Sequence, residues 1–215
     1  MSLRSPTFLR IELLSDATFS PGHGTPGVVD IEVAHDDCGL PFICGRTVRG
    51  LLRDAWLSMH PYFPELAPAA ARVLGRNRAL EESCRLRVGD AVLPQRVRQA
   101  ARAAVEQRGR TGLSSETILG ALTSIRYQTA EDRETGAPAE ATLRSSRVLL
   151  RGLFFDARLR WLDSYSPGPD DLRVLALCAL ATRHGGLLRN RGRGHLRVTL
   201  DGDLELTRCW ARGRA

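Results

Sequence analysis

The residues of this sequence best suited to chemistry are arginines, which gather in three clusters. All 31 basic residues are arginines, and the formal net charge is +7. The clusters consist of Arg46, Arg49 and Arg53, then of Arg85, Arg87, Arg96, Arg98, Arg102, Arg108 and Arg110, and finally of Arg183, Arg189, Arg191, Arg193 and Arg197. A charge run is usually only a solvated face. Three clusters, two of them joined to glycines, favour a polyanionic partner that offers phosphates.

The first cluster opens an amphipathic helix predicted over residues 46–59. At 100° per residue the three arginines lie on one side, with Gly50 among them, and an apolar stripe lies on the other. Helix N-termini attract anions, and glycine allows close approach to the backbone. The predicted phosphate-binding residues here are Gly45, Arg46, Thr47, Arg49, Gly50 and Arg53.

The third cluster contains a glycine-rich loop, residues 185–194, with the sequence GGLLRNRGRG. Backbone N–H groups cradle phosphate only where no Cβ blocks the approach. Such a loop is weak evidence alone, and the neighbouring arginines strengthen it. The predicted phosphate-binding residues here are Gly185, Gly186, Arg189, Arg191, Gly192, Arg193 and Gly194.

Asp30 is a candidate metal-binding residue. It follows Gly27-Val28-Val29 in a segment, residues 28–33, that is predicted to be a short strand with Asp30 facing outward. A carboxylate near phosphate calls for a divalent cation, Mg²⁺ or Mn²⁺, between the two. The alternative is a carboxylate that caps the loop or pairs with an arginine. His23, in the preceding glycine loop, is either a general acid or base or a plain surface residue.

The pattern of the remaining elements predicts an α+β fold. Strands are expected at residues 8–19, 40–43, 84–93 and 195–200, and either one long strand or a pair of strands at 147–162. Helices are expected at 95–107 and 172–184, the latter with Asp170 as N-cap. Residues 61–82 read as irregular helix. The order predicts a ferredoxin-like, RNA-recognition-like βαββαβ arrangement with an inserted helical region at about 60–110. Residues 113–146, polar and turn-rich, predict a protruding hairpin rather than a core element.

Composition places the chain, 215 residues long and 43% hydrophobic, among single globular domains. Its five cysteines form no C-x-x-C pair, which disfavours a zinc site or a secreted disulfide framework and favours buried thiols in the cytoplasm. No apolar run is long enough to cross a membrane, so no membrane partner is expected.

Residues 27–53, GVVDIEVAHDDCGLPFICGRTVRGLLR, carry a family resemblance. They are similar to the N-terminal signature of RAMP superfamily backbone subunits: a glycine-rich loop, Asp, a short strand, G-x-P-x-I, and a glycine-led basic helix start. Residues 185–194 resemble the second hallmark of the family, a glycine- and arginine-rich loop between the last helix and the last strand. The chain thus resembles a Csm/Cmr-like backbone subunit of type III CRISPR effector complexes.

This resemblance implies a ferredoxin-like palm with a protruding thumb, here residues 113–146. Such subunits stack along a CRISPR guide RNA, contact target RNA, and adjoin further RAMP subunits and a large polymerase-like subunit. In active members the aspartate before the signature helix cuts target RNA with a divalent metal, and Asp30 occupies that position.

Three other functions remain open at this stage. A noncatalytic scaffold of the same complex would keep Asp30 as a vestige. A stand-alone endoribonuclease that processes CRISPR RNA precursors would carry two ferredoxin-like halves, whereas one is expected here. A generic basic RNA-binding domain would leave the signature unexplained.

Overall fold

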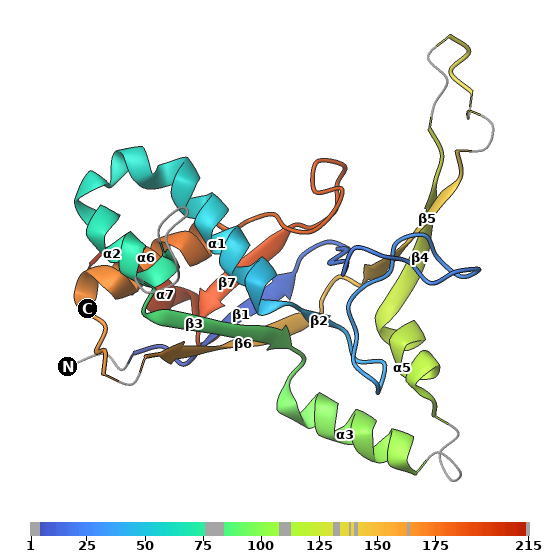
Figure 1. The fold of residues 1–215 in the computed structure, drawn as a ribbon, viewed down its shortest axis with the longest axis horizontal. Helices are drawn as coiled ribbons and strands as arrows, with labels where there is room; N and C mark the ends of the chain where they lie inside the picture. Colours follow the sequence, from blue (N-terminus) through green and yellow to red (C-terminus); the bar gives the residue numbers. More distant parts are fainter. Residues whose placement is uncertain are drawn as a thin grey trace.

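A five-stranded antiparallel sheet forms the centre of the molecule (Figure 1). The computed structural model describes residues 5–75, 84–107, 113–130, 134–137, 139, 142–162 and 164–213. The strands, in their order across the sheet, are β2 (Phe42–Ile43), β3 (Leu86–Val92), β6 (Phe154–Trp161), β1 (Phe8–Leu13) and β7 (Leu196–Leu200). Strands that are distant in sequence are therefore neighbours in space.

The two faces of the sheet differ because side chains alternate along each strand. In β1, Leu9, Ile11 and Leu13 are buried, whereas the alternate residues, which include Phe8 and Arg10, remain partly exposed. The same alternation runs through β6. One face of the sheet therefore enters the core, and the other is left without a continuous covering of helices.

Four helices cover the buried face: α1 (Gly45–Met59), α2 (Ala67–Leu74), α6 (Pro169–Ala181) and α7 (Leu204–Ala211) (Figure 1). Two short 3₁₀ turns, η1 (His60–Tyr62) and η2 (Pro64–Leu66), join α1 to α2. In α1 the buried side includes Val48, Leu52, Ala55 and Trp56, as the apolar stripe in the sequence predicts. The three arginines lie on the opposite, less buried side.

A second unit consists of α3 (Gln95–Glu106), α5 (Ser115–Leu122) and the hairpin of β4 (Thr123–Gln128) and β5 (Arg144–Leu149). The strands pair antiparallel from Thr123↔Leu149 to Gln128↔Arg144, and the hairpin projects from the main body (Figure 1). Its base is part of the core, because Leu119 of α5 and Leu149 are buried there. The range 113–146 therefore includes at least one residue, Leu119, that belongs to the core.

The start of α6 corrects the predicted N-cap. Gly168 holds that position, and its N–H donates to Asp171 Oδ2 at 2.9 Å. Asp171 is fully buried and also accepts hydrogen bonds from Tyr165 and from Arg72, at 3.0 Å. Asp170 is exposed. A buried carboxylate requires such partners. The sequence could not show that Asp171 rather than Asp170 is the buried one, because Arg72 lies far away along the chain.

The α+β class is confirmed, as are the helices at residues 46–59 and 95–107 and the strand at 84–93. The strand predicted at 28–33 is wrong, because that segment forms only isolated bridges, Thr25↔Val29 and Ile31↔Ser146. Helix α6 ends at Ala181, before His184, and α7 was not predicted. Within the range 60–110 assigned to an insertion, β3 belongs to the central sheet.

Candidate nucleic-acid interface

Residues 145–147 of β5 bring together segments that lie far apart in the sequence. Ser145 N donates to Asp30 Oδ2 at 2.6 Å, and Arg193 donates to Ser146 Oγ at 2.9 Å. Arg147 forms an ion pair with Glu32 at 2.7 Å. The predicted catalytic loop and the glycine-rich loop are therefore attached to consecutive residues of one strand.

The Asp30 carboxylate is exposed and held at one oxygen. Besides the Ser145 backbone N–H, the Ser145 hydroxyl donates to the same Oδ2 at 2.9 Å. These bonds, the backbone one first, lower the pKa of Asp30, and the nearby Arg144 lowers it further. The other oxygen, Oδ1, accepts no hydrogen bond from any residue in the described part of the chain. Asp30 is therefore fully ionised near neutral pH and has one oxygen available.

Glu32 is a structural carboxylate that the sequence did not single out. It is 5% exposed, and its Oε1 accepts from Arg147 and also, at 2.9 Å, from Val33 N. Its Oε2 accepts from Thr25 Oγ1 at 3.2 Å. Strand alternation would place Glu32 on the same side as Asp30, but the buried Arg147 contact draws it inward instead. This ion pair fixes the path of the loop that presents Asp30.

His23 lies in the same loop and is exposed, with its backbone carbonyl accepting from Glu32 N at 3.1 Å. No group of three His, Cys, Asp or Glu able to hold a metal ion occurs among the described residues. A divalent cation at Asp30 would therefore find no ready set of three such ligands among the described residues and would take most of its ligands from water or a bound phosphate. That arrangement suits Mg²⁺, which keeps several waters and binds through one or two carboxylates plus phosphates.

Glycines close the base of the loop at residues 185–194. Gly185 N donates to the Gly194 carbonyl at 2.9 Å, and Gly194 N donates to the Asp16 carbonyl at 2.8 Å. Gly194 has a φ of +70°, and a Cβ there would lie 2.0 Å from the Gly185 oxygen. Gly192 has a φ of +76° with open space around it. The first two glycines therefore shape the loop, whereas Gly192 leaves its backbone accessible to a ligand.

The three loop arginines have different environments. Arg191 is exposed, and Arg189 makes a long ion pair of 3.7 Å with Asp54 of α1, with both side chains exposed. Arg193 is partly buried, and this burial, together with the nearby Arg126, lowers its pKa. Arg189 and Arg191 are thus the side chains with access to solvent, and Arg193 attaches the loop to the hairpin.

Along α1, Arg46 and Thr47 are exposed, and nothing lies within 4 Å of a Cβ placed at Gly50. Arg49 donates to the Leu74 carbonyl at 3.1 Å, which ties α1 to α2, and Arg53 is partly buried. The remaining residue, Gly45, donates its N–H to Asp90 Oδ1 at 2.7 Å, and a Cβ there would meet the Val88 oxygen at 2.5 Å.

A groove lies between α1 and the end of α6, and the third arginine cluster contributes Arg183 and Arg189 to it, whereas no arginine of the first cluster is among its lining residues. It is lined by Leu51, Asp54, Ala55, Leu57, Ser58, Ala181, Thr182, Arg183, His184 and Arg189. The middle cluster contributes no residue to this groove. Arg96, Arg98 and Arg102 lie on α3, and Arg108 and Arg110 fall outside the described residues. RNA binding by the predicted glycines and arginines stays a prediction, with the exposed ones as its best candidates.

The fold and these surfaces define an α+β protein with exposed arginines on α1 and on the glycine-rich loop, and with a projecting hairpin that contacts this loop. Its structure is similar to a chain in a structure of the Type III-B Cmr-beta bound to cognate target RNA, with a TM-score of 0.65 and 11% identity over 91% of this chain and 96% of that one. A second similar chain comes from a structure of the Type III-B Cmr-beta in the apo state, with a TM-score of 0.64 and 13% identity over 92% and 97%.

The resemblance to type III subunits that the sequence motifs indicated is thus confirmed at the level of the fold. No protein-family model matches the sequence, and no curated protein is significantly similar to it. None of the helices that the structure describes is long and apolar enough to span a bilayer.

Proposed function

We propose that this chain is a CRISPR RNA-binding backbone subunit of a type III effector complex. The observation that carries the proposal is the joining of two arginine-bearing elements, α1 and the glycine-rich loop, through Arg189 and Asp54 in one groove. The fold likeness to Cmr-beta chains supports it, and so does the net charge of +7. In the proposed complex, the partners are guide RNA, target RNA, neighbouring RAMP subunits and a large polymerase-like subunit, in the cytoplasm.

The arrangement of strands supports a ferredoxin-like palm. Taken without β2, the order β3-β6-β1-β7 places the first and third strands of the βαββαβ series at the centre, with α1 and α6 as its two helices. The hairpin β4–β5 is the proposed thumb, and η1, η2, α2 and α3 supply the inserted helical parts.

Phosphates of the guide would bind along α1 and the glycine-rich loop through charge rather than through base edges. Arg46, Arg189 and Arg191 offer exposed guanidinium groups, and Gly50 and Gly192 leave the backbone open beside them. Arginine forks match phosphate oxygens in pairs. Such contacts are independent of sequence, which suits a subunit that must accept any guide.

Asp30 is the proposed catalytic residue for target RNA cleavage. Its ionised carboxylate, fixed by Ser145, would hold a Mg²⁺ or Mn²⁺ ion through Oδ1. A divalent ion bound there would supply charge stabilisation at the scissile phosphate. The Glu32–Arg147 ion pair keeps the loop in place, and Ser145 orients the carboxylate while leaving one oxygen exposed.

A noncatalytic scaffold is the second candidate, and one contact favours it. The Ser145 bonds make Asp30 a tether between the loop and the hairpin, which is a structural task that needs no metal. RNA binding is common to both candidates, so metal-dependent cleavage separates them.

The experiment for the proposed function is to express the full chain with its neighbouring genes and a CRISPR array, and to sequence the RNA that co-purifies. We expect guide RNAs from the array, with a large polymerase-like subunit in the same fraction. Recovery of the chain with no array-derived RNA would contradict the proposal.

A further inference from the structure

The sheet face opposite α1 and α6 holds a pocket that the proposed guide-binding groove does not use. It lies between the central strands and α3, and its volume of 710 Å³ falls in the range of about 300–1,000 Å³ typical of ligand sites. The lining residues include Phe8 of β1, Arg158 of β6, and Gln95, Arg98 and Arg102 of α3. We propose that this pocket binds a nucleotide unit of single-stranded RNA.

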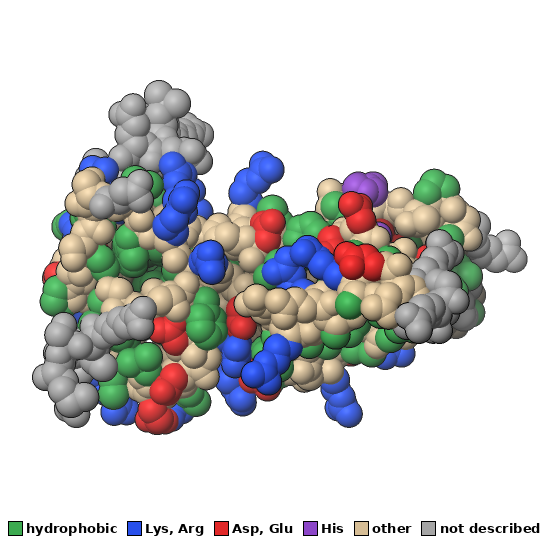
Figure 2. Space-filling model, turned by 90° about the horizontal axis from the view of Figure 1, so that it is seen from below, with side chains coloured by type: hydrophobic (Ala, Val, Ile, Leu, Met, Phe, Trp, Pro, Cys, Tyr) green, Lys and Arg blue, Asp and Glu red, His purple; other side chains and the backbone are tan. Residues whose placement is uncertain are grey.

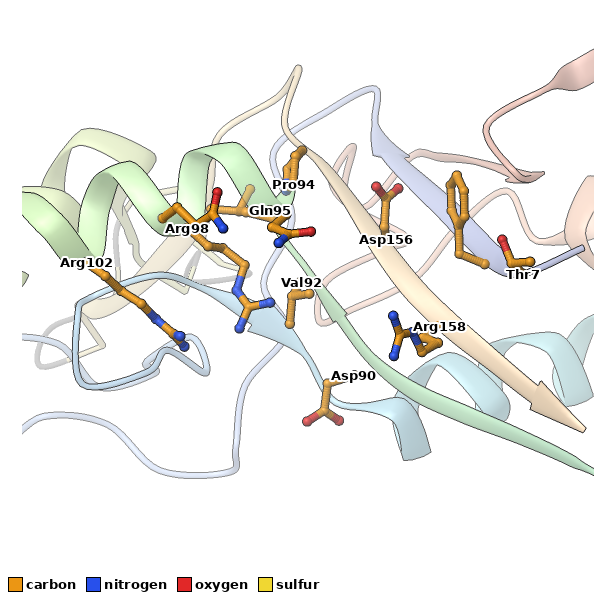
Figure 3. A pocket seen from close by; sticks show the side chains of 12 residues that line it. Thr7, Asp90, Val92, Pro94, Gln95, Arg98, Arg102, Asp156 and Arg158 are labelled. Atoms are coloured by element: carbon orange, nitrogen blue, oxygen red, sulfur yellow. The ribbon is translucent and has the colours of Figure 1, made fainter. Parts of the chain in front are cut away.

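Three guanidinium groups converge on the pocket from two elements. Figure 3 shows Arg98 and Arg102 extending from α3, with Arg158 of β6 on the other side of Val92. None of the three makes an ion pair with a residue in the described ranges. The middle arginine cluster, which stays apart from the groove at α1, therefore contributes two of its members to a site of its own.

The two acidic residues of the pocket are already engaged. Asp156 accepts from Arg10 at 2.8 and 2.9 Å, and Asp90 accepts from the Gly45 N–H at 2.7 Å. Figure 2 views the molecule from this side and shows arginine side chains spread over the middle of the surface, with acidic side chains between them. The pocket therefore offers three guanidinium groups without an ion pair in the described ranges, whereas both of its carboxylates already accept hydrogen bonds. This balance favours a polyanionic ligand.

An aromatic platform distinguishes a nucleic acid from other polyanions. Phe8 lies opposite Arg158 in the β1–β6 register, and the Arg10 guanidinium lies 5.4 Å from the Phe8 ring and 4.6 Å from the Phe154 ring. Phe154 is 36% exposed. A row of Phe, Arg and Phe on an open sheet offers flat groups on which unpaired bases stack. Gln95 adds an amide at the pocket wall.

The alternating sequence FLRIEL carried a signal for this platform, because Phe8 and Arg10 share the face opposite the leucines. Two other aromatic residues are placed less well for stacking. Phe19 is buried, and Phe42 is partly buried in a strand at the edge of the sheet. Phe8, which starts β1 and faces away from the core, is therefore better placed to contact a ligand than either of them.

The test is fluorescence anisotropy of the full chain with a labelled single-stranded oligouridylate over a range of salt concentrations. For Arg98→Ala/Arg102→Ala we expect affinity about tenfold weaker and a salt slope reduced by about 1.4, since each single-strand phosphate contact contributes about 0.7. Phe8→Leu, which keeps an apolar side chain, should weaken binding about tenfold through lost stacking and leave the slope unchanged. Arg208→Ala/Arg212→Ala, at the C-terminal end of α7 and directly after it, is the matched control and should bind as wild type.

Two further arms separate this inference from the proposed function. Arg189→Ala/Arg191→Ala reports on the groove at α1, so an effect there without any effect of the pocket variants would overturn the pocket alone. Duplex RNA should compete poorly for the pocket, because its bases are not free to stack. If the pocket variants bind RNA normally but lose self-association in sedimentation, the surface binds protein and the inference is wrong.

Discussion

At the scale of single residues, Ser145 and Asp30 decide whether the chain is an enzyme. The two Ser145 hydrogen bonds occupy one carboxylate oxygen and leave the other exposed, so the same residue serves as tether and as candidate metal ligand. The sequence predicted the metal-binding role but not the tether, because Asp30 and Ser145 are 115 positions apart. The motif gave Asp30, and only the fold supplied its partner.

Asp30→Asn removes the charge and preserves the shape of the side chain. In an assembled complex with labelled target RNA, we expect binding within a few-fold of wild type and metal-dependent cleavage at least about 100-fold slower, on the order of 3 kcal/mol of transition-state stabilisation. Asp37→Asn, in the following exposed turn, is the control. Cleavage that persists in the Asp30→Asn complex would remove the catalytic assignment, and a wild type without cleavage would favour the scaffold.

Ser145→Ala tests the cause of the lowered Asp30 pKa. Because hydrogen bonds to the ionised carboxylate depress its pKa, loss of the hydroxyl should raise it toward the ordinary aspartate value. The tether strengthens folding above the unfolded-state pKa and weakens as pH falls through the lower folded-state pKa. The check is an NMR titration of the Asp30 carboxyl carbon. An unchanged midpoint in Ser145→Ala would assign the shift to the backbone N–H or to Arg144.

Asp171→Ala should lower the free energy of unfolding by about 3 kcal/mol, because it leaves Arg72 and Tyr165 without their buried partner. Asp170→Ala, one residue earlier and exposed, should change it by less than about 0.5 kcal/mol. Urea denaturation of the two variants measures both values. Equal effects would show that the buried network contributes nothing particular.

At the scale of elements, local periodicity determined what the sequence could predict. The apolar stripe of α1 repeats about every turn of helix, and the alternation of β1 repeats every two residues. Both patterns could therefore be recognised from neighbouring residues alone. The segment at residues 28–33 looked like a strand, but Glu32 turns inward to Arg147, a residue far along the chain. The glycine-rich loop was found, while its attachment to the hairpin through Arg193 and Ser146 was not.

The structure allows the proposed thumb to be tested with a shorter deletion than the whole range 113–146. Since Leu119 and Leu149 are buried at its base, replacing only residues 129–143 by a short Gly-Ser turn should leave the melting temperature nearly unchanged. Assembly along RNA should become irregular, because the proposed thumb no longer reaches the duplex or the next subunit. Circular dichroism and electron microscopy supply the two readouts. A large fall in melting temperature would place the distal hairpin in the folding unit, and regular filaments would contradict its role in assembly.

At the scale of the whole molecule, charge and topology indicate the same function. The helices cover one face of the central sheet, the hairpin projects at one end, and the glycine-rich loop lies between α1 and the hairpin (Figure 1). Two basic surfaces result, one at the α1 groove and one beside α3. Composition predicted a polyanionic partner, but only the fold divides the arginines between these surfaces.

The measurement that tests the central claim most directly is the salt dependence of guide RNA binding by Arg189→Ala/Arg191→Ala. These arginines are exposed on the glycine-rich loop, so their loss should leave folding intact. We predict weaker binding to guides of any sequence and a slope of log K against log salt that is smaller by about 1.4 than in wild type or in Arg208→Ala/Arg212→Ala. An unchanged affinity and slope would show that the loop is only a solvated surface and would contradict the proposed guide-binding function.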